Sequence, residues 1–314
     1  MIKGITIGRH QPKWAQFLKS QYINVPNFDY TLKGRRKFFT MGSCFAEEIR
    51  KALIKHGLTA LPEYEKFEFD VSQIKIDELP GRPHLNYYNT FSIRQELAWT
   101  LGFETRPRDV WEIRDRFFRS GKNVYQDPYK RLVVARDENV LQKHLKQINK
   151  TILDGINKAE FFVFTFGMAE VFRNEKTGFV AAQKPAYSGG GGIKETKFHS
   201  SLVAENIKNI QMICDMLDSH RNQQIPIVLT VSPVPLERTF SSNDIFIANN
   251  EGKSKLRAAV SEVASQRQNV FYFPAFDIIQ AIGNDAFKPD GRHIKEEVIE
   301  AITASFTKAA GVGY

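Results

Sequence analysis

Residues 37–46, KFFTMGSCFA, join an apolar run to a helical pattern through the small residues of GSC. The apolar run predicts a buried strand, because such strands read as short continuous stretches of hydrophobic residues. Beyond Cys44, apolar residues recur every four positions from Phe45 to Leu53, which predicts an amphipathic helix that ends near Gly57. A strand that turns directly into a helix is typical of α/β folds.

Three more apolar runs end in small or turn-forming residues and predict further buried strands: Phe161–Phe166, Ile225–Val231 and Val270–Phe273. Amphipathic patterns predict helices over 139–157, 201–218 and Glu296–Phe306. Strands that alternate with helices favour a mainly parallel sheet covered on both faces, so we expect a three-layer α/β/α sandwich. Reactive groups in such folds gather beyond the carboxyl ends of the strands.

The length of 314 residues is compatible with two domains of roughly 150 residues, but one elaborated α/β domain fits as well. We expect a single domain over 1–314, with long insertions at about 58–138 and 172–200. Such insertions are candidates for a substrate lid. The second contains the glycine run Gly189–Gly192, for which we favour a flexible surface loop over a phosphate cradle because no P-loop lysine accompanies it.

Composition and charge exclude several classes of protein. No run approaches the roughly 18 to 20 apolar residues of a membrane span, and the start of the chain lacks the apolar core of a secretory signal. We therefore expect a cytoplasmic protein without a transmembrane segment. The net charge of +9 is spread along the chain without a basic block, which argues against a nucleic-acid partner. The two cysteines, Cys44 and Cys214, are too few for a disulfide framework and are expected to be free thiols.

The junction of strand and helix at Ser43 and Cys44 suits a nucleophile. Backbone amides at a helix start can stabilise an oxyanion, and the positive end of the helix dipole lowers the pKa of a thiol placed there. Each residue also has a structural interpretation. Cys44 can be a small buried residue that packs the turn, and Ser43 can be the N-cap of the helix.

Asp290 and His293 form a second candidate pair, in KPDGRHIKEE near the end of the chain. A spacing of three residues lets the carboxylate orient the imidazole while the ring reaches a nucleophile from another strand. The alternative is a turn aspartate and an exposed loop histidine.

A basic, aromatic-lined groove is a further hypothesis. It would use Arg82, His84, Arg94 and the stretch 111–119, WEIRDRFFR, to bind an anionic sugar or a phosphorylated acyl donor. An ordinary solvated surface is the alternative, and we favour it.

The GSCFA string, FFVFTFGMAEVF, TVSPVPL and the terminal DGRH resemble the GSCFA family, a relative of the SGNH (GDSL-type) esterases and acyltransferases. The matching elements run from about residue 37 to residue 306. The resemblance implies that Cys44 stands at the position of the nucleophilic serine of the SGNH pattern and Ser43 at that of its aspartate. It further implies that Asp290 and His293 complete a triad. The two glycines of the pattern are Gly42 and Gly167.

Two departures from the SGNH pattern matter. A cysteine replaces the serine nucleophile unless Ser43 takes that role, and Ala169 stands where the oxyanion asparagine is expected. Replacement donors would be the backbone amides at 43–45 or the side chains of Asn86 and Asn89. A helix cap is the alternative for Asn89. Losing one such donor typically costs roughly 2.7–4 kcal/mol of transition-state stabilisation.

A cysteine thiolate activated by a histidine takes an acyl group from the donor and forms a thioester with it. A thioester suits acyl transfer as well as hydrolysis. The resemblance implies an ester or glycan as substrate. Glu170, which follows the strand end at Gly167, is a candidate contact to a sugar hydroxyl or to the catalytic histidine, and a partly solvated carboxylate is the alternative. We expect no required cofactor, although acyl-CoA is a candidate donor for a transferase, and no motif indicates a metal. The competing hypothesis is a catalytically silent glycan-binding or polysaccharide-assembly protein.

Overall fold

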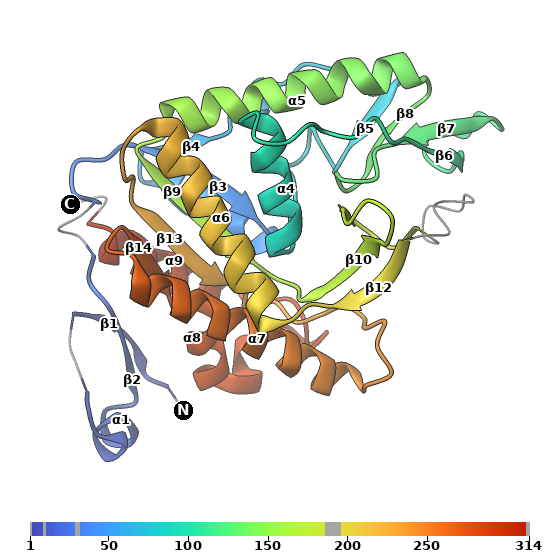
Figure 1. Ribbon diagram of the computed structural model, residues 1–314. Helices are drawn as coiled ribbons and strands as arrows, with labels where there is room; N and C mark the ends of the chain where they lie inside the picture. The colour runs from blue at the N-terminus through green and yellow to red at the C-terminus, as the bar shows by residue number, and fades with distance from the viewer. Residues whose placement is uncertain (1, 9–10, 29–31, 186–195, 312–314) are drawn as a thin grey trace.

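The structure is a computed structural model that describes residues 2–8, 11–28, 32–185 and 196–311 (Figure 1). The glycine run Gly189–Gly192 lies outside these residues. A five-stranded sheet occupies the centre of the molecule, with every neighbouring pair parallel and the order β14-β13-β9-β3-β4. Its strands are β3 (Lys37–Gly42), β4 (Thr59–Leu61), β9 (Phe161–Phe166), β13 (Ile227–Val231) and β14 (Val270–Phe273).

Four of these five strands coincide with the apolar runs predicted from the sequence, so the expected α/β fold is confirmed. The central strands are buried on both sides because their alternate residues enter two different hydrophobic clusters. Phe38 of β3 and Phe161 of β9 belong to one cluster, and Phe39 and Phe162 belong to the other. A sheet with two apolar faces requires helices on each.

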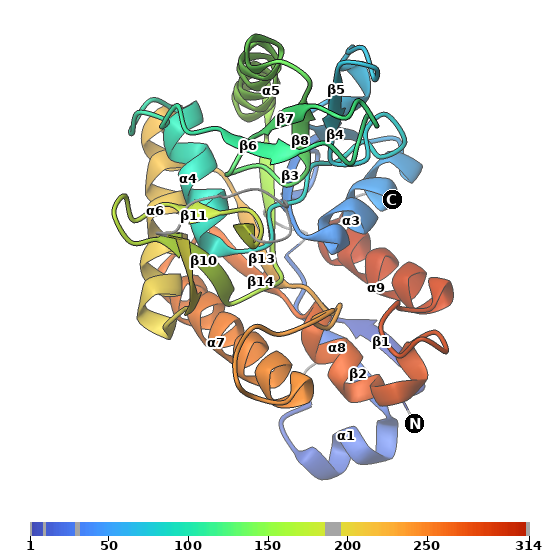
Figure 2. The same cartoon turned by 90° about the vertical axis from the view of Figure 1, so that its right-hand side faces the viewer.

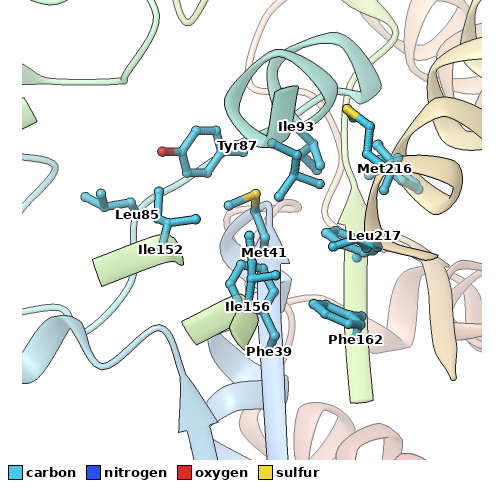
Figure 3. Packing of buried hydrophobic residues seen from close by; sticks show 14 of the residues in the cluster. Phe39, Met41, Leu85, Tyr87, Ile93, Ile152, Ile156, Phe162, Met216 and Leu217 are labelled. Atoms are coloured by element: carbon cyan, nitrogen blue, oxygen red, sulfur yellow. The ribbon is translucent and has the colours of Figure 1, made fainter. Parts of the chain in front are cut away.

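Helices cover both faces of the central sheet (Figure 2). Those in the cluster with Phe38 are α3 (Cys44–Lys55), α8 (Ala275–Ile282) and α9 (Glu296–Ala309). Those in the cluster with Phe39 are α4 (Thr90–Thr100), α5 (Glu138–Lys158), α6 (Val203–Arg221) and α7 (Ile245–Gln266). Figure 3 shows Phe39 and Met41 of β3 packed among side chains that include Ile156 of α5 and Leu217 of α6.

The remaining strands form smaller sheets, and two of these are antiparallel. One has the order β5-β8-β7-β6, and the other has the order β11-β10-β12. The expected mainly parallel arrangement thus describes the central sheet but not these strands. Short loops join β6 to β7, β7 to β8 and β10 to β11, which suits antiparallel pairing because a parallel pair requires a crossover of a dozen or more residues, whereas α4 separates β5 from β6. Their bounds are β5 (Ile74–Ile76), β6 (Trp111–Arg114), β7 (Asn123–Gln126), β8 (Val133–Ala135), β10 (Glu170–Asn174), β11 (Val180–Ala181) and β12 (Thr196–Ser200).

The N-terminal residues add a parallel pair of strands at one end of the molecule, where β1 contacts α9 (Figures 1 and 2). The elements there are β1 (Gly4–Ile7), α1 (Trp14–Ser20) and β2 (Tyr22–Val25), and short 3₁₀ helices elsewhere are η1 (Tyr64–Lys66) and η3 (Gly283–Ala286). Within the described ranges, no helix has both the length and the apolar character that crossing a bilayer requires.

Candidate active site

The end of β3 lies tightly against β9. A Cβ atom on Gly42 would stand 2.3 Å from the carbonyl oxygen of Thr165, so a side chain cannot be placed there without moving the strands. The next amide, that of Ser43, donates to the same Thr165 oxygen at 3.0 Å. Gly42 therefore allows the two strand ends to approach, and it does not itself line the adjoining pocket.

Ser43 and Cys44 have different roles at the start of α3. Ser43 is the N-cap, is 2% exposed, and its Oγ accepts the amide of Phe45 at 3.4 Å. Cys44 is the first residue of the helix and is partly exposed. Of the two candidate nucleophiles, Cys44 is thus the one open to solvent.

A pocket of about 330 Å³ opens beside Cys44 at the carboxyl ends of β3, β9 and β13. Six residues singled out from the sequence line it: Ser43, Cys44, Asn89, Arg116, Gly167 and Glu170. Others that line it were not expected from the sequence, among them Tyr88, Arg131, Lys184, Phe240 and Arg292. The structure therefore brings much of the proposed site together at the edge of the parallel sheet.

Two hydrogen-bond donors remain available beside Cys44. The amide of Ser43 is bonded to Thr165 and that of Phe45 to the Ser43 hydroxyl, whereas the Cys44 amide finds no acceptor among the described residues. The Oδ1 atom of Asn89 caps α4 by accepting the Ser92 amide at 2.8 Å, while its Nδ2 makes no hydrogen bond within the described part of the chain. The two interpretations of Asn89 are compatible, because it is a helix cap and also lines the pocket.

Asn86 lies outside the pocket. It is 3% exposed, its backbone pairs with Gly42, and its amide donates to the Oδ2 atom of Asp77 at 2.7 Å. Neither polar atom of its side chain has a hydrogen-bond partner among the residues that the structure describes. The structure therefore does not bring Asn86 to the position expected of an oxyanion donor.

Glu170 lines the pocket but is already engaged. Its carboxylate accepts the hydroxyl of Thr239 and, at 3.0 Å, the amide of Phe240. The side chain is 6% exposed, so its main contact is with the segment that follows β13.

Asp290 and His293 contact each other, as the spacing predicts. The imidazole Nδ1 lies 2.5 Å from one carboxylate oxygen, and the other oxygen accepts the amides of Arg292 and His293 at 3.0 and 2.9 Å. These contacts hold the pKa of Asp290 well below its ordinary value. The side chain of His293 is 62% exposed and does not line the pocket, although its neighbour Arg292 does. No hydrogen bond joins His293 to Cys44 in this structure.

Burial raises the pKa of the Cys44 thiol, and the positive charges of Lys253, Arg292 and Arg82 oppose that rise only in part. The expected lowering at the helix start is therefore wrong in its net direction. The reason is that desolvation of a thiolate at this depth outweighs the nearby charges.

Lys253 of α7 was not expected from the sequence. Its ammonium donates to the carbonyl oxygens of Gly167 and Ser232, each at 2.8 Å, and so joins the ends of β9 and β13 beneath the pocket. Lys253 is 2% exposed, and burial lowers its pKa to about 7. A signal was present, because Lys253 occupies the same stripe of α7 as the buried Leu256 and Val260.

The basic groove suggested by the sequence does not form as expected. Arg116 lines the pocket, but Arg82 pairs with Glu47 and Glu78, and Arg94 pairs with Glu104. His84 is buried, with its Nε2 atom 3.3 Å from the Gly42 oxygen. Across the described residues, no group of three His, Cys, Asp or Glu side chains is placed to hold a metal ion.

Comparisons with known proteins give few matches. No curated protein matches the chain in sequence. A family 3 carbohydrate esterase from Clostridium thermocellum is similar in structure at 11% identity and a TM-score of 0.33, over 87% of this chain and 94% of that chain. Such a low score leaves the function of this chain to be argued from its own site. A family model described as GSCFA family matches residues 37–306, which run from β3 into α9, and the chain therefore belongs to the GSCFA family.

Proposed function

We propose that this chain is an SGNH-like acyl-transfer enzyme that hydrolyses or transfers an acetyl-like group on a carbohydrate hydroxyl. The observation that carries the proposal is the position of Cys44. It lies at the start of a 12-residue helix, in a pocket at the carboxyl ends of parallel strands, and its amide has no acceptor in the described part of the chain. The same proposal includes a single three-layer α/β/α domain over 1–314.

The reaction begins with attack of the Cys44 sulfur on the carbonyl carbon of the ester. The Cys44 amide and the Nδ2 of Asn89 are the available donors for the oxygen that becomes negative. Collapse of the intermediate breaks the ester bond, releases the alcohol and leaves a thioester on Cys44. Water or an acceptor hydroxyl then attacks the thioester carbonyl and restores the thiol. No step needs a cofactor, and an acyl-CoA would serve as donor in the transferase form.

His293 is the proposed proton carrier, with Asp290 holding its tautomer. It takes the thiol proton and returns it to the departing alkoxide. Because its ring is exposed, it can turn towards the pocket without loss of packing, and Arg292 already places this segment at the pocket. Catalytic hydrogen bonds are often incomplete before substrate binds. We propose that binding draws the ring to the sulfur.

A catalytically silent glycan-binding or assembly protein is the second candidate. The raised pKa of Cys44 and the position of His293 outside the pocket favour it. Under this hypothesis the pocket binds a glycan, and Cys44 forms no covalent intermediate.

Intact-protein mass after exposure to p-nitrophenyl acetate tests the proposal. The variants are Cys44→Ala and Ser43→Ala, with Cys214→Ala as a matched control because Cys214 is fully buried in α6. We expect one acetyl group on the wild type, Ser43→Ala and Cys214→Ala, and none on Cys44→Ala. An acetyl adduct that persists in Cys44→Ala contradicts an acyl enzyme at Cys44. The same conclusion follows if the folded wild type and the folded variants all lack the adduct.

A further inference from the structure

The pocket beside Cys44 is strongly cationic. Two carboxylates line it, and Glu170 is already engaged by Thr239 and Phe240. Glu237 is the other; its side chain is 63% exposed and pairs with Arg238 at 3.4 Å. The cationic side chains that line it are Arg116, Arg131, Lys184, Arg238 and Arg292. A pocket with this excess of positive charge attracts anions.

Arg131 is held in a fixed orientation. Its Nη1 atom lies 2.8 Å from the Oδ1 of Asp77, and its guanidinium lies above the ring of Tyr88, 5.9 Å from the centroid. Asp77 is 1% exposed, so this carboxylate lies behind the arginine rather than in the pocket. The contact uses one of the five donors of the guanidinium and leaves others for a ligand.

Arg292 lies next to the proposed catalytic histidine. Its nearest carboxylate is that of Glu237, at 3.8 Å, beyond hydrogen-bonding distance. The Nε atom of Arg292 is buried and has no partner among the described residues. A buried donor without an acceptor is unfavourable, so an acceptor supplied by a ligand would be stabilising.

Much of the rest of the lining is apolar. Its apolar side chains include Val171, Phe172, Val234, Leu236 and Phe240. Lys184 lies with its Nζ 4.9 Å from the centroid of the Phe240 ring and makes no ion pair with the described carboxylates. Cations above an apolar wall suit a ligand that combines an anionic group with apolar surface.

We propose that the substrate bound beside Cys44 carries an anionic group, a carboxylate, sulfate or phosphate, which Arg131 and Arg292 bind. This inference rests on the proposed function, because it names the class of the acyl donor or acceptor. The anion can belong to an acidic glycan or to the phosphates of an acyl-CoA. Both sources share the chemistry that the guanidinium groups recognise.

Alkylation of Cys44 by paired reagents tests the pocket without any need for catalysis. Iodoacetate and iodoacetamide are similar in size and differ in charge. In a Cys214→Ser background, we expect the rate ratio of iodoacetate to iodoacetamide at Cys44 to exceed that of the neutral thiol 2-mercaptoethanol by about tenfold at low salt. This excess in the rate ratio should fall in Arg131→Gln and Arg292→Gln but not in Lys197→Gln, a lysine of β12 outside the pocket. A ratio equal to that of 2-mercaptoethanol overturns the proposal.

Protection of Cys44 from iodoacetamide then identifies the source of the anion. The probes are coenzyme A, trigalacturonate and the fully methyl-esterified trigalacturonate, which is neutral. Protection by coenzyme A alone assigns a phosphorylated donor, and protection by trigalacturonate but not by its ester assigns an acidic glycan. Equal protection by the acidic and the neutral trimer, or none by either anion, overturns the proposal. If an anion protects Cys44 but the protein forms no acyl enzyme with p-nitrophenyl acetate, the anion site is supported and the proposed acyl-transfer function is contradicted.

Discussion

The start of α3 and the segment that holds Asp290 and His293 carry the two halves of the proposed site and differ sharply. Ser43 is buried, capped onto its own helix and bonded to β9, whereas His293 is exposed and bonded only to its near neighbours. Packing therefore fixes the position of Cys44, whereas the contacts of the His293 ring are local, although Arg292 lines the pocket and Ile294 is buried in the core. The comparison shows that a motif can form its local geometry while its imidazole still lies outside the pocket.

Gly42→Ala and Gly291→Ala should show the largest difference between the two regions. The new methyl group would meet Thr165 at 2.3 Å in the first variant, whereas nothing lies within 4 Å in the second, where φ is +69°. We expect Gly42→Ala to lower the free energy of unfolding by about 3 kcal/mol or more, and Gly291→Ala by about 1 kcal/mol. Urea unfolding measures both, and equal losses would contradict a tightly packed junction.

Lys253→Met removes the buried ammonium that bonds the carbonyl oxygens of Gly167 and Ser232. Its effect is measured through the pH dependence of stability. The folded protein releases the Lys253 proton near pH 7, whereas the unfolded chain keeps it up to its ordinary pKa of 10.5. The unfolded state thus binds more protons between these values, and stability rises with pH. Between pH 7 and pH 9 we expect the wild type to gain about 2 kcal/mol relative to Lys253→Met. Parallel stability curves for the two proteins would show that Lys253 keeps an ordinary pKa.

Ser43→Ala sharpens the assignment of Ser43 as a cap rather than a nucleophile. Loss of the contact to the Phe45 amide should cost about 1 kcal/mol of stability. Ser43→Thr, which keeps a hydroxyl, is the matched control and should retain part of the stability that Ser43→Ala loses. The measurement is urea unfolding together with the yield of acylated protein. A loss of acylation in Ser43→Ala, with stability unchanged, would reverse the assignment.

Asp290→Asn should have the smallest effect on stability, because the pair is exposed. The pKa of Asp290 is lowered in the folded protein. Its stabilising contribution is therefore present above the ordinary pKa of 3.8 and is lost as the pH falls from 3.8 through the lowered pKa of the folded state. We expect the wild type and Asp290→Asn to differ slightly at pH 6 and by less at pH 2. Thermal unfolding at the two pH values measures this, and a difference that grows in acid would contradict it.

Local patterns in the sequence predicted four strands, the helix after Cys44 and the turn that pairs Asp290 with His293. Each depends on residues close together in the chain. β4 was missed, since a strand of three residues offers almost no periodicity. The small antiparallel sheets were missed for a similar reason, because their strands are short and pair within long insertions.

The charge of the pocket could not be predicted in the same way. Arg131, Lys184 and Arg292 come from segments far apart in the sequence, and only the fold brings them to Cys44. Of the basic residues proposed from the sequence, Arg116 alone lines the pocket, because Arg82 and Arg94 pair with acidic side chains elsewhere. The depth of Cys44 is also a property of the fold, so its raised pKa could not be read from the helix start.

The rate of Cys44 acetylation in the wild type and in His293→Ala, followed by intact mass over a range of pH, tests the central claim most directly. If the exposed imidazole turns into the pocket and takes the thiol proton, His293→Ala should slow acetylation at pH 7 by about a hundredfold or more. The acetylation rate of His293→Ala should approach that of the wild type as the pH rises towards the raised pKa of the thiol, because the thiol then ionises without a base. Equal rates in both proteins at pH 7 would contradict a Cys44–His293 site.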